Sequence, residues 1–261
     1  MIRAIVILAA TVQAAYANPP QIAKRFAITQ IPLPAKHAQP TTSFAVCGGA
    51  VVMVPVDGAL IAPELGITLI PARSKPVTTV SCDAAGDAYW LAGRTLLRTT
   101  GAARKVESLA DLPAGDLHIV DRVEQQVRLW GKTSERWAVM SWDVAGGVTT
   151  LFSGDKPITA AASAGQDALV FATGREVWVW RARRAQRLVT MSHEVDGLAV
   201  GSDGSVFVST ENGVAALTSM RDKPVTLVTG IHGPLIARLG ALYVLSSDNN
   251  VILRLVDQGI Q

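Results

Sequence analysis

Two of the four histidines in this 261-residue chain, His118 and His193, have carboxylates close by in the sequence, and a third, His232, belongs to the same candidate group. An imidazole beside a carboxylate can bind a transition metal or act as a general acid and base. The candidate site residues are Asp116, His118, His193, Glu194, Asp196 and His232. No H-x-H or H-E-x-x-H pattern links them, so polar loop residues around a solvated pore are the alternative interpretation.

Other kinds of chemistry have little support in the sequence. There is no G-x-S-x-G nucleophile elbow, and neither a G-x-G-x-x-G nor a Walker loop is present. The net charge is only +3, and the one cluster of arginines, at positions 181, 183, 184 and 187, is smaller than the broad basic face of a nucleic-acid-binding protein. We therefore expect no nucleic-acid partner, and we interpret the six tryptophans as core residues rather than a sugar platform.

The elements that must position the candidate residues repeat along the chain. Relatives of "DGSVFVST" recur at intervals of 36 to 42 residues, and the small or polar residues that open them are Ala50, Ala88, Gln126, Ala168, Ser205 and Ala241. Each copy follows a short apolar run and precedes a tight polar turn and further short strands. Four short antiparallel strands in about 40 residues is the period of a propeller blade. The sequence predicts an all-β, six-bladed β-propeller in which the candidate histidines lie near the mouth of the central channel.

The sixth unit has no fourth strand of its own after "NVILRL". The segment "RFAITQIPL", residues 25–33, is a spare strand near the other end of the chain. We predict that it pairs with "NVILRL" as the outer strand of the last blade, which closes the ring and covers an exposed edge.

One segment has two interpretations. Val120, Val123, Val127 and Trp130 recur at helical spacing. The register of the repeat instead predicts two strands joined by a turn at residues 123–126, and we favour the strands because neighbouring copies agree.

The first residues have the features of a secretory signal peptide. Arg3 precedes an apolar run, and Ala15-Tyr16-Ala17 matches the small-x-small pattern of a cleavage site. We expect residues 1–17 to be a signal peptide and residues 18–261 to form a single propeller domain. The apolar run is shorter than the roughly 20 residues of a membrane span, and no later segment is long enough, so we predict no membrane span and a periplasmic or secreted protein.

Cys47 and Cys82 are the only cysteines, and each ends the predicted first strand of one of two adjacent blades. In an oxidising compartment this spacing predicts a disulfide that joins those blades and contributes about 3 kcal/mol. The alternative is two buried free thiols.

The stretches "EVDGLAVGSDGSVFVSTENGVAAL" and "GIHGPLIARLGALYVLSSDNNVILRL" resemble the blades of NHL-repeat and gluconolactonase/regucalcin-like six-bladed propellers. In the lactonase branch the resemblance implies one divalent metal at the channel mouth, held by a Glu, several Asn and an Asp in a D-G pair. Asp196-Gly197 stands where that pair would be. The other ligands are not matched, since "SFAVCGG" has no Glu and "VTTVSCD" has no Asn.

Two functions follow from these observations. We expect an exported, non-catalytic propeller that binds a protein or a small-molecule ligand and needs no cofactor. The alternative is a metal-dependent, lactonase-like hydrolase that holds a divalent metal at the channel mouth. The sequence leaves open whether the chain is an enzyme.

Overall fold

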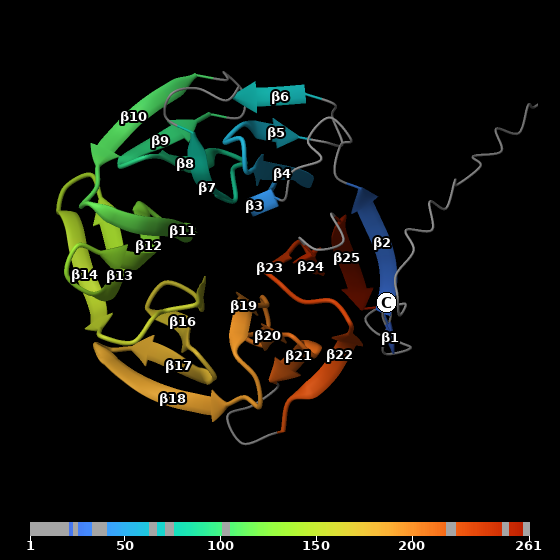
Figure 1. The fold of residues 1–261 in the computed structure, drawn as a ribbon. Coiled ribbons are helices and arrows are strands. Elements are labelled where there is room, and N and C mark those ends of the chain that lie inside the picture. The colour runs from blue at the N-terminus through green and yellow to red at the C-terminus, as the bar shows by residue number, and fades with distance from the viewer. Residues whose placement is uncertain are drawn as a thin grey trace, which may run out of the picture.

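The computed structural model describes residues 21–22, 26–32, 41–62, 67–70, 76–100, 105–217, 223–246 and 251–257. The regular elements of these residues are all β-strands, and they form six sheets arranged around a central channel (Figure 1). The predicted six-bladed propeller is confirmed. The predicted signal peptide lies outside the described residues.

The first three blades each consist of four consecutive antiparallel strands. Their strands are β3 (Thr41–Cys47), β4 (Ala50–Pro55), β5 (Leu60–Ala62) and β6 (Ile67–Ile70) in blade one; β7 (Val77–Cys82), β8 (Ala88–Ala92), β9 (Thr95–Thr99) and β10 (Val106–Asp111) in blade two; and β11 (Gly115–Val123), β12 (Gln126–Thr133), β13 (Trp137–Asp143) and β14 (Gly147–Gly154) in blade three.

The last three blades repeat this order, with additions from the N-terminal part of the chain. Their strands are β15 (Ala160–Ser163), β16 (Ala168–Thr173), β17 (Glu176–Arg181) and β18 (Arg184–Thr190) in blade four; β19 (Val195–Val200), β20 (Val206–Thr210), β21 (Gly213–Leu217), β22 (Val225–Thr229) and β1 (Gln21–Ile22) in blade five; and β23 (Leu235–Arg238), β24 (Ala241–Ser246), β25 (Val251–Asp257) and β2 (Phe26–Pro32) in blade six.

The first strand of every blade lines the channel, and each one contacts the first strand of the next blade. The contact of β23 with β3 joins blade six to blade one, so the ring is closed. Residues that enter or leave these inner strands therefore meet around the two ends of the channel.

Blade six is completed by the N-terminal strand, as predicted. β2 pairs antiparallel with β25 from Phe26 opposite Asp257 to Pro32 opposite Val251. The sequence analysis did not predict β1, which adds to the outer edge of β22 as a fifth strand of blade five.

The predicted repeat positions coincide with real strand starts. Five of the six opening residues are the first residue of the second strand of a blade, and Ser205 directly precedes β20. The segment 120–130 forms β11 and β12 joined by a turn at Glu124, whose φ of 54° lies in the left-handed region. The prediction of strands is confirmed there, and the helical spacing of the valines has no structural counterpart.

Six clusters of buried hydrophobic residues fill the spaces between neighbouring blades, one for each junction in the ring. All six tryptophans belong to these clusters or pack against them, as expected. The junction between blades four and five differs from the others, because its cluster contains and contacts only aliphatic residues and one methionine. Each of the other five includes or contacts at least one Phe, Tyr or Trp.

Cys47 and Cys82 end β3 and β7, and their Cα atoms lie 5.3 Å apart, at disulfide-bonding distance. The pair therefore links blades one and two at the channel end where the inner strands finish. A search of the described residues for a helix capable of crossing a membrane found none.

Candidate functional site

The channel has a small cavity at each end. The cavity where the inner strands begin has a volume of about 270 Å³, and we call it the histidine mouth; its polar lining includes Ser43, Thr79, His118, Thr159 and Asp196. The cavity where the inner strands finish has a volume of about 160 Å³, and we call it the arginine mouth; its polar lining includes Ser81, Asp121, Ser163 and Arg238.

Asp196 and His232 are brought together at the histidine mouth. Asp196 lies on β19, and its Oδ2 is 2.5 Å from Nδ1 of His232 in the loop before β23. Because an ionised carboxylate can only accept, Nδ1 of His232 donates to it. Both side chains are partly exposed, and Oδ1 of Asp196 is buried with no hydrogen-bond partner among the described residues.

Two glycines allow this contact between blades five and six. A Cβ atom on Gly197 would lie 2.2 Å from the carbonyl oxygen of Gly233, so no larger residue fits there without moving the backbone. Gly233 is held in turn by a hydrogen bond from its N–H to Oγ of Ser209, at 2.9 Å. The Asp196-Gly197 pair is thus explained by close backbone packing.

His118 forms part of the wall of the histidine mouth. Its ring stacks on Trp130, which lies opposite it on β12, with ring centroids 4.5 Å apart. Burial lowers the pKa of His118, and the Asp116 carboxylate, 3.9 Å away and largely exposed, opposes that shift only in part. His118 therefore presents a neutral imidazole at pH 7.

The other predicted residues lie apart from the mouth lining. His193 pairs with Glu211 of the β20–β21 turn, at 2.5 Å, and Glu194 is exposed. No group of three or more His, Cys, Asp or Glu side chains that could hold a metal occurs among the described residues. Asp196 and His232 thus meet and His118 lines the same mouth, whereas His193 and Glu194 lie apart, so the six candidates do not converge on one point.

The polar residues at the histidine mouth are mostly hydroxyls and imidazole, with Asp196 as the carboxylate of that lining. A calcium ion takes six to eight oxygen ligands, commonly from several carboxylates or amides. The donor set at this mouth does not fit such an ion.

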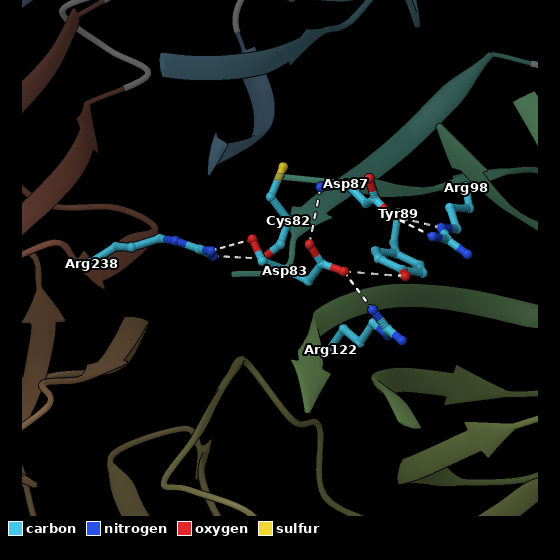
Figure 2. A network of polar contacts seen from close by, with 7 residues as sticks. All are labelled: Cys82, Asp83, Asp87, Tyr89, Arg98, Arg122 and Arg238. Carbon is cyan, nitrogen blue, oxygen red and sulfur yellow. Dashed lines mark hydrogen bonds and ion pairs between the residues drawn. The ribbon is translucent and has the colours of Figure 1, made fainter. Parts of the chain in front are cut away.

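A polar network that the sequence did not predict lies at the arginine mouth (Figure 2). Asp83, buried after the end of β7, accepts hydrogen bonds from Arg122 at 2.5 Å and from the Tyr89 hydroxyl at 3.4 Å. Arg238 reaches the same place from blade six and donates to the carbonyl oxygens of Cys82 and Asp83. Three blades are therefore joined by one set of charged groups.

A second buried group lies beside this network. Asp121 accepts a hydrogen bond from Ser163 at 2.6 Å, and burial raises the pKa of Asp121 while Ser163, Arg128 and Arg238 oppose the shift. Arg128 is 3% exposed and donates to Ser163 and to the carbonyl of Ala168. A charged residue at the end of several inner strands, as in "SCD", "VDR" and "IAR", was the available sequence signal.

Several solved structures have the same architecture as this chain. A gluconolactonase from Xanthomonas campestris superimposes with a TM-score of 0.71 at 12% identity, covering 92% of this chain and 95% of that one. The chain has the fold of the gluconolactonase-like six-bladed propellers.

Two other propellers illustrate how varied this fold is in function. Virginiamycin B lyase from Staphylococcus aureus matches with a TM-score of 0.63 and 11% identity, over 88% of this chain and 99% of the lyase. The extracellular domain of a one-component system from B. thetaiotaomicron matches at a TM-score of 0.60 and 11% identity, over 82% of this chain, which spans about a third of that longer protein. No protein-family model and no curated protein matches the sequence. The similarity between this chain and these proteins is therefore a similarity of fold.

Proposed function

We propose that this chain is an exported, non-catalytic propeller that binds a small polar ligand in the histidine mouth. The observation that carries the proposal is a pair of unsatisfied polar atoms. Oδ1 of Asp196 and Oγ1 of Thr159 are buried without hydrogen-bond partners among the described residues, and both residues line the same cavity. Buried polar atoms are normally hydrogen-bonded, so a ligand that reaches both atoms and pairs with them would gain the free energy of those hydrogen bonds.

The two atoms define the chemistry of the ligand. A carboxylate oxygen needs a donor, and a threonine hydroxyl can donate or accept. A polyol or an amino alcohol offers such groups at short spacing. The flat face of His118 and Trp130 provides an apolar wall for its carbon skeleton.

Export is supported by the amino-terminal signal features and by the cysteine pair. Disulfides persist in oxidising compartments outside the cytosol. One of the structural neighbours is itself described as an extracellular domain.

Saturation-transfer NMR with glucose, gluconate and ethanolamine as probes tests the binding proposal. Thr159→Val should raise the unfolding temperature, because it removes a hydroxyl that has no partner, and should weaken binding of any positive probe about tenfold. Asp196→Asn should weaken it at least as much. Asp155→Asn, which changes an exposed carboxylate paired with Arg136, is the matched control and should leave binding unchanged. If Thr159→Val and Asp196→Asn bind the probe like the unaltered protein, or if none of the probes binds, the proposal fails.

A lactonase-like hydrolase is the second candidate, because the Asp196–His232 contact lies beside the mouth of a gluconolactonase-like fold. Metal analysis of the purified protein and hydrolysis of glucono-1,5-lactone with added Ca²⁺ or Zn²⁺ distinguish the two. Stoichiometric metal together with turnover that His232→Ala abolishes would overturn the non-catalytic proposal. Turnover at the background rate with every metal would support it.

A further inference from the structure

A second kind of cavity lies away from the channel, between blades four and five. It is a groove of about 820 Å³, in the range usual for pockets that hold small molecules. Six valines and leucines line it, namely Val170, Val179, Leu188, Val189, Val206 and Leu217. The groove is separate from the histidine mouth, with which it shares no lining residue.

The groove exists because this junction is filled by small side chains. Of the six hydrophobic clusters, the one between blades four and five contains no aromatic residue. Several of its residues are alanines. In the junction between blades one and two, the second strand of the later blade contributes Trp90, whereas in the junction between blades four and five the second strand of the later blade contributes Val206 and Val208. Replacing a large ring by valine leaves space that the neighbouring sheets do not close.

The rim of the groove is basic. Arg181 and Arg184 flank the β17–β18 turn and are exposed, and neither guanidinium has an ion-pair or hydrogen-bond partner among the described residues. Asp167 is the one acidic residue of the lining. Gln166 and Gln186 add neutral polar groups on the same rim.

The turn between these arginines is fixed in an unusual conformation. Ala182 and Arg183 have φ values of 49° and 61°, so both residues of a two-residue hairpin turn lie in the left-handed region without a glycine or asparagine. The turn keeps Arg181 directly opposite Arg184 across the hairpin. Two guanidinium groups are thus held at neighbouring positions above an aliphatic groove.

We propose that this groove binds a free, single-chain amphiphile with an anionic head, such as a fatty-acid carboxylate. The aliphatic floor would take the alkyl chain, and the guanidinium groups match a carboxylate or phosphate head through paired N–H donors. An aromatic ligand would find no ring to stack on in this junction.

Titration calorimetry with decanoate, below its micelle concentration, tests the proposal. Decanoate should bind, and octanoate should bind about fifteenfold more weakly, because each methylene contributes about fourfold. Decanol, which has the same chain without the charge, should bind at least tenfold more weakly than decanoate. Equal binding of decanol and decanoate would overturn the proposed role of the arginines, and the absence of decanoate binding would overturn the proposal as a whole.

Variants on one hairpin provide matched controls. The double variant Arg181→Ala/Arg184→Ala should weaken decanoate binding at least tenfold, whereas Arg183→Ala, an exposed arginine of the same turn outside the groove lining, should leave it unchanged. Val179→Phe should block the groove and abolish decanoate binding. If Val179→Phe fails to fold, the arginine variants still test the proposal, because they change only exposed side chains. Equal decanoate affinity in the Arg181/Arg184 double variant and in Arg183→Ala would refute the site.

Two further experiments distinguish binding in this groove from binding to a membrane surface and from binding at the histidine mouth. Vesicles of phosphatidylglycerol test a membrane surface as the source of the anionic head, and retention on vesicles without binding of free decanoate would overturn the proposal. Asp196→Asn and Thr159→Val should not change decanoate binding. The proposal for the groove and the proposal for the histidine mouth are therefore tested independently.

Discussion

Nη1 of Arg238 lies 2.6 Å from the carbonyl oxygen of Cys82, although the first residue belongs to blade six and the second to blade two. The guanidinium of Arg238 thus passes blade one and joins two blades that do not pack side by side (Figure 2). Because the bonded groups are backbone carbonyls, the contact fixes where the chain leaves β7.

Arg238→Ala should therefore lower the free energy of unfolding by about 2–3 kcal/mol, since two hydrogen bonds from a charged donor are lost, although the Asp83 carbonyl keeps its bond from the N–H of Gly86. Arg238→Lys should cost less, because an ammonium can still reach one carbonyl. Arg136→Ala breaks an exposed ion pair with Asp155 and should cost under about 1 kcal/mol. Urea denaturation compares the three, and equal losses for Arg238→Ala and Arg136→Ala would contradict the bridging role.

The closing strand of the ring can be tested with two residues of β2. Ile31 is buried in the cluster between blades six and one, and Ile31→Ala should cost about 2–4 kcal/mol through lost packing and the cavity left behind. Thr29 lies on the same strand and is exposed, so Thr29→Ala should change stability by less than about 0.5 kcal/mol. A small effect of Ile31→Ala in thermal or urea unfolding would argue against the closure by β2.

The cysteine pair predicts a specific redox behaviour. Cys47 and Cys82 are 35 residues apart, and a disulfide that closes a loop of this length contributes about 3–4 kcal/mol in the chain-entropy description. Cys47→Ala/Cys82→Ala should lose about that much stability, and a reductant should destabilise the unaltered protein but not the double variant. Mass spectrometry after alkylation of the denatured, unreduced protein gives the direct measurement; two alkylated cysteines would exclude the bond.

His118 gives the chain a dependence on pH with a definite sign. Burial holds the pKa of His118 in the folded protein below its usual value of about 6.5. As the pH falls below about 6.5 the unfolded chain takes up a proton that the folded chain does not, so stability declines until the pH reaches the lowered pKa. His118→Gln should remove this part of the decline, while His193→Gln serves as the comparison.

NMR titration of the His118 ring measures the pKa directly, and unfolding between pH 7.5 and 5 measures the linked change. A pKa above 6.5, or the same pH slope in the His118→Gln variant, would contradict the proposed effect of burial.

The fold was predictable because every blade repeats one pattern of strand and turn. Ala50, Ala88 and Ala168 mark the second strand of a blade without any knowledge of tertiary structure. The pairing of β2 with β25 followed from the same count, since five complete units leave one strand missing. β1 was not foreseen, because a two-residue strand carries too little pattern to be recognised.

The site was predictable only in part. Asp196, near the start of β19, and His232, just before β23, occupy equivalent places in the repeats of adjacent blades, so the repeat register alone brings them near each other. The partner of His193 was missed because Glu211 lies in the β20–β21 hairpin turn, and the position of that turn relative to the loop before β19 depends on the twist of the sheet. The contact of Arg238 with the carbonyl of Asp83 was not predicted, because a long side chain can extend past the adjacent blade to a more distant one.

The placement of β1 on the outer edge of β22 has a practical consequence for anything joined ahead of residue 21. Such an attachment meets the molecule at its circumference, beside blade five, rather than over either end of the pore. A protein immobilised or fused through that side would keep both openings accessible to solutes, and probes for the two mouths could be measured on the same tethered sample.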